Sequence, residues 1–323
     1  MPKKISVVIP TYKRLNLLVN CLDALNKQSI PGHDFEVIVV NDGPSEEMIE
    51  ELDRRSENYT FRLVVRCTAE KKGPAAARNL GWLMASAQLV AFTDDDCLPQ
   101  ADWLKVFLDR HQARELVAYS GKTVVPLYAE PTDFALNTAR LSEADFITAN
   151  CACTKAALFK TGGFDEQFSM AWREDSDLEF KLMLANVPIY KNEQAVVVHP
   201  VREAAWGISL KEQRKGIFDV LLFKKYPGLY RQKIQRSPLW NYYVIVVLCI
   251  LGLVTALGGH SRLSAGITFV MLVLIIGFAL KRLQKTSRSR SHVAEMLITS
   301  VFIPFLSVYY RIYGSIRYRK MLF

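Results

Sequence analysis

The chain has 323 residues and a mass of 36.7 kDa, and half of its residues are hydrophobic, which is ample for a folded core. Its net charge of +9 conceals an uneven distribution, because residues 1–201 carry −6 and residues 202–323 carry +15. The acidic first part argues against nucleic acid as a partner, since binding to a phosphate backbone needs a basic surface. The basic second part contains long apolar runs, a combination that indicates contact with a membrane.

The six cysteines predict a reducing compartment, because they form neither a dense disulfide framework nor a pair with the spacing of a zinc site. The apolar run Val7-Val8-Ile9 is too short for the core of a signal peptide. We therefore expect the soluble part of the chain to lie in the cytoplasm.

The first hundred residues alternate between apolar runs and segments with helical spacing. Four runs have the length of buried strands, at residues 5–9, 35–40, 61–66 and 89–93. Three helices are expected between them, starting near Leu17, after Ser45 and at Gly73-Pro74. This alternation predicts an α/β fold with a mostly parallel sheet, in which ligands bind at the carboxyl ends of the strands.

Three polar clusters follow the first, second and fourth of these strands: Thr11 to Arg14, Asn41-Asp42-Gly43 and Asp94-Asp95-Asp96. The carboxyl ends of parallel strands meet at one edge of a sheet, so the three clusters are expected to outline one pocket. An aromatic ring, positive charges and carboxylates together suit a nucleotide diphosphate with its metal ion. Free backbone N–H groups at the Gly73-Pro74 helix start can bind the diphosphate, unless this is simply a solvated loop.

The three consecutive aspartates are the strongest single signal. Side chains alternate along an extended backbone, so Asp94 and Asp96 are expected to face one side and Asp95 the other. Two carboxylates in one pocket suit Mg²⁺ or Mn²⁺. The alternative is a solvated acidic turn at the end of a strand.

The pattern is less regular beyond Ala118. Residues 146–150 are expected to form a strand, residues 162–165 a turn, and residues 196–198 a strand that ends at His199. Ser176 and Glu179 fit a capping box for a helix that starts near Leu178. That assignment leaves Glu174 and Asp175 just before the helix, either for chemistry or to complement the helix dipole.

Taken together, six motifs resemble the family-2 glycosyltransferases, in the order typical of that family, from residue 4 to about residue 200. They are Val8-Ile9-Pro10-Thr11-Tyr12-x-Arg14, Asn41-Asp42-Gly43, Gly73-x-Ala75-x-Ala77-Arg78-Asn79, Asp94-Asp95-Asp96, Gly162-Gly163-Phe164-Asp165 and Glu174-Asp175-x-Asp177-Leu178. The resemblance implies a GT-A fold, which is a Rossmann-like mixed, mostly parallel sheet with helices on both faces. It also implies an inverting transfer of a sugar from a nucleotide diphosphate donor.

The resemblance also implies roles for individual residues. It places the donor against Pro10, Thr11, Tyr12, Arg14, Asp42, Gly73, Arg78, Asp94 and Asp95. It places Mg²⁺ or Mn²⁺ on Asp96 with Asp94, and His199 is either a third ligand or a structural histidine. Asp175, next to Glu174, would be the general base. No Trp follows Gln213-Arg214, so the motif of processive synthases is missing, which favours one transfer per acceptor.

Two apolar runs, Leu239 to Leu257 and Leu263 to Leu280, are each close to the ~20 residues needed to cross a bilayer. A seven-residue link, 258–264, would make them a hairpin. Five basic residues follow, and the positive-inside rule places them in the cytoplasm with the catalytic domain. We therefore expect a multi-pass protein of the inner or plasma membrane.

A third apolar run, residues 293–310, contains Glu295 and Pro304 and precedes a basic tail, so a re-entrant or interfacial segment is preferred over a third crossing. Residues 208–223 mix basic and apolar side chains, as an interfacial helix or a core helix of the enzyme domain would. The predicted parts are therefore a GT-A domain (1–205), a basic amphipathic linker (206–237) and a membrane region (238–323).

The expected partners are a nucleotide-diphosphate sugar, the membrane, and a lipid-linked or glycan acceptor that offers a hydroxyl or phosphate. One competing interpretation is a nucleotidyltransferase, which would need a glycine-rich phosphate loop near the first strand. The other is a catalytically inactive membrane scaffold with a glycosyltransferase-like domain. The intact carboxylates Asp94, Asp96 and Asp175 argue against the scaffold.

Overall fold

The computed structural model describes residues 2–322. The chain divides into two compact units. The first contains residues up to 126 together with 139–201, and the second contains residues 127–138 together with those from 202 onward. Each unit has its own architecture and is described separately.

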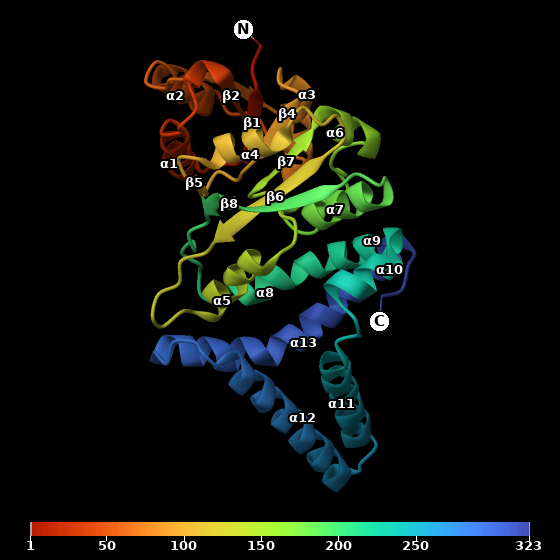
Figure 1. Ribbon diagram of the computed structural model, residues 1–323. Coiled ribbons are helices and arrows are strands. Elements are labelled where there is room, and N and C mark those ends of the chain that lie inside the picture. The colour runs from red at the N-terminus through yellow and green to blue at the C-terminus, as the bar shows by residue number, and fades with distance from the viewer. Residues whose placement is uncertain (1, 323) are drawn as a thin grey trace. The chain divides into compact units, whose positions relative to one another are not determined.

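The first unit is built on one eight-stranded mixed sheet with the strand order β3-β2-β1-β4-β7-β6-β8-β5 (Figure 1). Its strands are β1 Ile5–Thr11, β2 Phe35–Asn41, β3 Arg62–Cys67, β4 Leu89–Phe92, β5 Leu98–Pro99, β6 Ala118–Val124, β7 Cys151–Thr154 and β8 Ile189–Val198. The first four strands are parallel to one another, β6 is parallel to β8, and β7 runs antiparallel between β4 and β6. The mixed, mostly parallel sheet expected from the sequence is confirmed.

Helices cover both faces of this sheet. They are α1 Leu15–Leu25, α2 Glu46–Ser56, α3 Pro74–Met84, α4 Trp103–His111, α6 Lys155–Thr161 and α7 Glu174–Leu184, with short 3₁₀ turns η1 Gly32–Asp34 and η2 Arg140–Glu143. Alternate residues of β1 enter different cores: Val7 and Ile9 pack with α1, α2 and α4, whereas Val8 packs with α3, α6 and α7. Every residue of β1 and β2 is buried, which explains why these strands read as continuous apolar runs.

Two local predictions are wrong. Residues 146–150 form no strand, and β7 begins only at the next residue. Asn150 instead accepts a hydrogen bond from the indole of Trp103 and donates to the carbonyl oxygens of Lys122 and Ala195, so it braces the irregular pairing of β6 with β8.

The capping box at the start of α7 is the second wrong prediction. Helix α7 begins at Glu174, so Ser176 and Glu179 lie inside it. The residue before the helix is Arg173, which has a left-handed φ of 74° and makes no side-chain cap. Glu174 and Asp175 are therefore the first two residues of the helix rather than part of the preceding loop.

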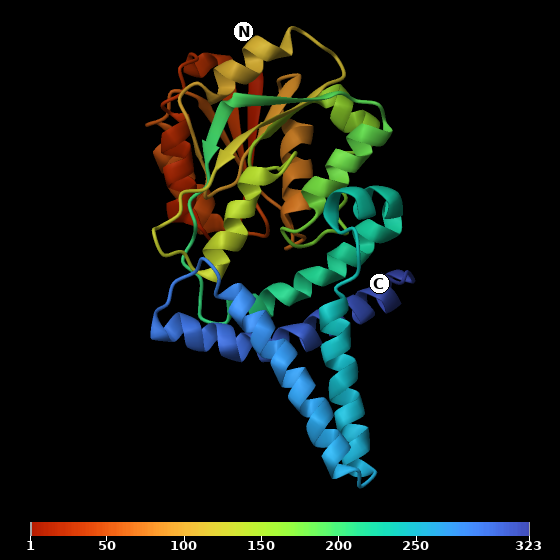
Figure 2. The same ribbon diagram turned by 60° about the horizontal axis from the view of Figure 1, so that its bottom comes forward.

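The second unit is helical. It contains α5 Asp133–Ala139, α8 Ile208–Glu212, η3 Gln213–Lys215, α9 Gly216–Lys225, α10 Pro227–Leu229, the π-helical η4 Tyr230–Ile234, α11 Trp240–Leu257, α12 Ser261–Arg282 and α13 Arg290–Tyr318. Helices α11 and α12 pack as an antiparallel hairpin, and α13 runs across its open end (Figure 2). The link in the hairpin is shorter than predicted, because α12 already begins at Ser261.

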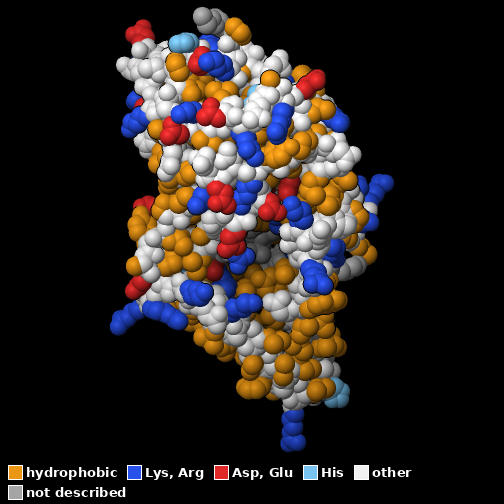
Figure 3. Space-filling model, in the orientation of Figure 1, with side chains coloured by type: hydrophobic (Ala, Val, Ile, Leu, Met, Phe, Trp, Pro, Cys, Tyr) orange, Lys and Arg blue, Asp and Glu red, His pale blue; other side chains and the backbone are white. Residues whose placement is uncertain are grey.

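Helices α11, α12 and α13 are each long and apolar enough to cross a membrane. Side chains on the surface of the α11–α12 hairpin are almost all hydrophobic (Figure 3). Residues 208–223, expected as one helix, are two short helices and a 3₁₀ turn. The apolar residues of α9 are buried in the second unit, where α9 packs against α13.

Candidate active site

The carboxyl ends of β1 and β4 are joined by Asp95. Thr11, the last residue of β1, donates from Oγ1 to Asp95 Oδ2 at 2.7 Å, and Arg14 Nη1 donates to Asp95 Oδ1 at 2.9 Å. Burial raises the pKa of Asp95 to about 6, although Arg14 opposes this shift. Asp95 is thus separated from Asp94 and Asp96, as the alternation predicted, although all three residues follow the end of β4 rather than lying within it.

Asp42, just after β2, holds the loop that leads into α3. Its carboxylate accepts the backbone N–H of Lys72 at 2.7 Å and that of Gly73 at 2.9 Å. The Lys71 ammonium lies 3.6 Å from the centroid of the Tyr12 ring, so the first polar cluster also reaches this loop. The sequence-predicted donor residues Tyr12, Asp42 and Gly73 are therefore neighbours.

Gly73 is required at its position for two reasons. Its φ of 102° is one that other residues rarely adopt, and a Cβ atom would lie 2.5 Å from the carbonyl oxygen of Ser169. Gly162 also has a positive φ, of 74°, but a Cβ there would meet nothing within 4 Å. The two glycines therefore differ in two ways: Gly162 is left-handed helical with open space beside it, whereas Gly73 has a backbone conformation essentially restricted to glycine and is crowded by Ser169.

We expect Gly73→Ala to lower the unfolding temperature clearly more than Gly162→Ala. In the control, alanine has only to adopt the left-handed helical backbone, at a cost of about 1–2 kcal/mol. In Gly73→Ala, alanine must adopt a backbone conformation essentially restricted to glycine and must also displace a backbone carbonyl. Thermal unfolding of both full-length variants in detergent measures the difference. Equal unfolding temperatures would contradict the close approach of Ser169.

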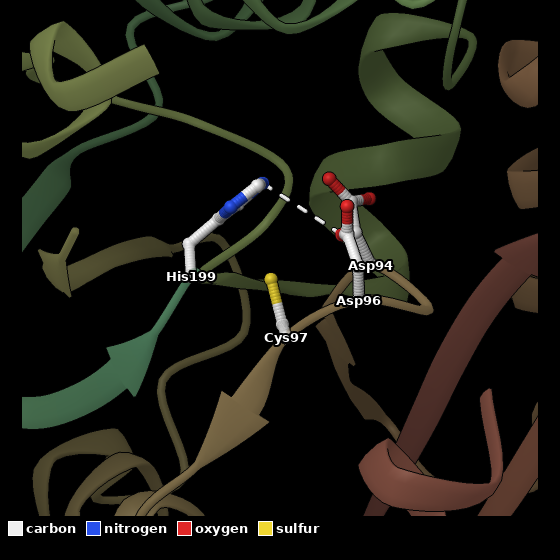
Figure 4. A group of neighbouring side chains, drawn as sticks. All are labelled: Asp94, Asp96, Cys97 and His199. Carbon is white, nitrogen blue, oxygen red and sulfur yellow. Dashed lines mark ion pairs between the residues drawn. The ribbon is translucent and has the colours of Figure 1, made fainter. Parts of the chain in front are cut away.

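A second cluster consists of Asp94, Asp96, Cys97 and His199, whose potential ligand atoms all lie within 4.8 Å of one another (Figure 4). Strand β5 pairs with β8 so that Leu98 lies opposite Val198. This register explains why the neighbours of these two residues, Cys97 and His199, come together. His199 Nε2 is 3.7 Å from Asp96 Oδ1.

The hydrogen bonding of His199 suits a metal ligand. Its Nδ1 lies 3.2 Å from the carbonyl oxygen of Pro200, which can only accept, so Nδ1 carries the proton of the neutral ring. The lone pair of Nε2 is then free to bind a metal ion on the side of the ring that faces Asp96. Metal-bound histidines commonly donate their other ring N–H to a carbonyl in this way.

The donor set fits a hard divalent ion. The two carboxylates suit Mg²⁺ or Mn²⁺, and the His199 imidazole would add one nitrogen ligand. Without a metal ion, burial and the nearby Asp94 and Asp96 raise the pKa of the Cys97 thiol. Cys97 is the one member of the cluster that the sequence did not predict, although its place directly after the aspartates was a usable signal.

Arg78 connects this cluster to the start of α7. The guanidinium is buried, its Nη2 donates to Asp94 Oδ1 at 2.7 Å, and its Nη1 donates to Glu174 Oε1 at 3.1 Å. Although burial acts to raise the pKa of Asp94, the charge of Arg78 holds that pKa below its usual value. Arg78 therefore uses two of its nitrogens on protein carboxylates from α7 and from the turn after β4.

Glu174 and Asp175 occupy different environments. Burial raises the pKa of Glu174 to about 7 against the opposing charge of Arg78, and this residue is only 4% exposed. Asp175 is half-buried, and its Oδ1 accepts the backbone N–H of Ser176 at 2.6 Å. Burial raises its pKa as well. Of the two carboxylates, Asp175 is the one more open to an incoming molecule.

Some of the motif residues hold the site together rather than face a ligand. The Asn79 side chain donates to the carbonyl oxygen of Phe164 and accepts its N–H, both at 2.9 Å. Lys181 of α7 donates to the carbonyl oxygen of Gly163 at 3.0 Å. The Gly162-Gly163-Phe164 turn thereby fixes α7 relative to α3, and with it Glu174 relative to Arg78.

The chain resembles known glycosyltransferases. The model of the glycosyl transferase family 2 matches residues 6–167. Glycosyltransferase AglE from Haloferax volcanii is 35% identical over 101 residues, which cover 31% of this chain and 33% of that protein. Chondroitin synthase from Escherichia coli is 26% identical over 295 residues, covering 76% of this chain and 43% of that protein. The chain thus matches less than half the length of either relative.

One solved structure resembles nearly the whole chain. The mannosyltransferase PcManGT from Pyrobaculum calidifontis, in complex with GDP-Man and Mn²⁺, superposes with a TM-score of 0.61 at 17% identity. The likeness covers 96% of this chain and 89% of that one, and it shows a shared fold. Since the family model spans half of the sequence and includes β1, β2 and the three aspartates, the chain belongs to glycosyl transferase family 2.

Proposed function

We propose that this chain transfers a sugar from a nucleotide diphosphate donor to an acceptor hydroxyl or phosphate, with inversion at the anomeric carbon. The observation that carries the proposal is the Arg78 bridge, which joins Asp94 of the candidate metal cluster to Glu174, the residue next to Asp175. A donor site and a base side by side are what such a transfer requires.

The donor would be held by residues at the ends of β1, β2 and β4. Tyr12 offers a ring face to the nucleobase of the donor, and Lys71 and the exposed Arg14 offer positive charge to its phosphates. Asp94, Asp96 and His199 would hold Mg²⁺ or Mn²⁺, which supplies positive charge to the leaving diphosphate. GDP-Man and Mn²⁺ in the neighbouring mannosyltransferase structure support a ligand set of this kind.

Asp175 would act as the general base. Its carboxylate takes the proton of the acceptor hydroxyl while that oxygen forms a bond to the anomeric carbon. The bond from this carbon to the diphosphate breaks, and the phosphate oxygen leaves with the electron pair. Because attack and departure occur on opposite faces, the configuration inverts. A pKa raised by burial makes Asp175 a stronger base than an ordinary aspartate.

The α11–α12 hairpin would anchor the enzyme in the inner or plasma membrane, with residues 1–205 as the cytoplasmic catalytic domain, 206–237 as the linker and 238–323 as the membrane region. This placement favours a lipid-linked glycan acceptor, which presents its sugar or phosphate at the membrane face. The absence of a Trp after Gln213-Arg214 supports one transfer per acceptor.

The test uses the purified full-length chain and a panel of nucleotide sugars, with release of nucleotide diphosphate as the readout. We expect turnover with a subset of donors, loss of turnover with EDTA, and recovery on addition of Mn²⁺. Asp96→Asn should lower turnover about 100-fold, as loss of charge stabilisation at a leaving group typically does. The matched control is Asp109→Asn, an exposed aspartate on α4.

No turnover with any donor would favour the inactive scaffold. Turnover that is insensitive to EDTA and equal in Asp96→Asn and the parent would remove the metal and its ligands from the proposal while leaving the transfer reaction in place.

A further inference from the structure

Helix α13 differs from the other two long apolar helices in how much of it is covered by protein. In its most apolar stretch 39% of residues are buried, against 11% in each of α11 and α12. Between its terminal arginines, Arg290 and Arg317, its exposed large residues are all apolar or aromatic: Leu297, Ile298, Val301, Phe302, Tyr309, Ile312, Tyr313 and Ile316. One face of the helix thus packs against the rest of the second unit, and the opposite, apolar face has no protein contact among the residues described.

The packed face carries polar contacts along most of its length. Near its start, Glu295 accepts the backbone N–H of Gly207 at 2.8 Å. In its middle, Thr299 and Ser300 accept from Arg282, which also donates to Asp133 at 2.9 Å. Toward its end, the buried Arg311 donates to Gln235 at 2.8 Å and lies 3.8 Å from Asp219.

These contacts are incompatible with a membrane crossing. Glu295 and Arg311 lie ~24 Å apart along a helix that rises 1.5 Å per residue. A crossing helix would therefore carry at least one of these two charged side chains, with the segment it contacts, into a hydrocarbon core ~30 Å thick. Charged groups there are costly and rare, and the irregular backbone near Gly207 and Gln235 would be exposed to lipid.

Two hydrogen-bonding contacts fix the position of α13 along the axis of the α11–α12 hairpin. The last helical residue of α12, Arg282, binds Thr299 and Ser300 in the first half of α13. At the start of α11, the Tyr243 hydroxyl donates to the carbonyl oxygen of Leu322, just after α13, at 3.3 Å. The start of α11 and the end of α12 lie on the same side of an antiparallel hairpin. The first half of α13 and the segment just after it therefore lie at the open end of the hairpin, across which α13 runs in Figure 2.

We propose that α13 lies flat in the membrane interface, with its exposed apolar face in the boundary between headgroups and acyl chains. Lipid covers this exposed face, because it adjoins the apolar surface of the α11–α12 hairpin, which is itself expected to lie in the bilayer. Basic residues at both ends of the helix are placed for anionic headgroups: Arg288, Arg290, Arg317, Arg319 and Lys320. The chain then crosses the membrane twice. This inference depends on the hairpin crossing and is independent of the proposed activity.

Topology is tested with single added cysteines in the full-length chain carrying Cys67→Ser and Cys249→Ser, since the other four cysteines are buried. Arg288→Cys, Lys320→Cys and His260→Cys introduce exposed thiols before α13, after it and at the hairpin tip. A membrane-impermeant maleimide should label the first two from one side of sealed vesicles and His260→Cys from the other. Labelling of Lys320→Cys together with His260→Cys would overturn the proposal.

A measurement of depth in the bilayer tests whether lipid covers the exposed apolar face of α13. Spin labels at Ile312→Cys on α13 and at Ile250→Cys, which is exposed near the middle of α11, are compared in vesicles of phosphatidylethanolamine and phosphatidylglycerol. We expect the label at 312 to be lipid-exposed and ~5–10 Å below the headgroups, well above the label at 250. A label at 312 that is as deep as that at 250, or one shielded from lipid by a second copy or another protein, would refute the flat placement.

Discussion

Arg78→Met is expected to destabilise the chain by about 3–5 kcal/mol, because it leaves two carboxylates, Glu174 and Asp94, without their shared buried cation. It should also separate the donor cluster from the base and abolish transfer. Arg78→Lys keeps the charge but cannot span both carboxylates with a planar fork, so an intermediate loss is expected. Arg54→Met is the control, since Arg54 pairs with Glu51 only at the surface, where such pairs contribute little to stability.

The stability deficit of Arg78→Met should depend on pH. Without the cation, burial raises the pKa of Glu174 and Asp94 above their values in the unfolded chain. Their protonated forms fit the folded state, so the deficit is small near pH 5 and grows as pH rises through the folded pKa values. Thermal unfolding at pH 5 and pH 8 measures this. A deficit that is the same at both values, or no larger than that of Arg54→Met, would contradict the buried bridge.

Asp175→Asn is expected to lower kcat by about 10²–10⁴-fold, the usual contribution of a positioned base, while KM for the donor and the unfolding temperature change little. The amide keeps the size of the side chain and can still accept the N–H of Ser176. In the parent, the rate should fall as pH drops through the pKa of Asp175, because only the carboxylate accepts a proton.

Glu174→Gln separates the roles of the two carboxylates. Glu174 is the partner of Arg78, so its loss should lower the unfolding temperature and affect donor binding and rate together. Initial rates at saturating donor, together with KM for donor and acceptor, distinguish the two variants. If Asp175→Asn kept the parent rate while Glu174→Gln lost it without destabilisation, Glu174 would be the base.

The sequence predicted most of the first sheet because the relevant information is local. Strands such as β1 and β2 are buried on both faces, so they appear as continuous apolar runs that end at polar turns. The helix after Ser45 was predicted because its cap, Ser45 accepting the N–H of Met48, involves residues three apart. The strand expected at residues 146–150 was wrong because the apolar side chains there are buried in a turn. Asn150 holds this turn by donating hydrogen bonds to β6 and β8, which are far away in the sequence.

By itself, the sequence determined the α/β class, the edge of the sheet at which polar residues gather, and the two apolar helices of the hairpin, since each follows from residues close together in the chain. Only the tertiary structure decided that Arg78 joins Asp94 to Glu174, that His199 meets Asp96, and that residues 127–138 fold with the second unit. Those contacts join positions far apart in sequence. They depend on strand register and helix packing, which no local pattern of side chains encodes.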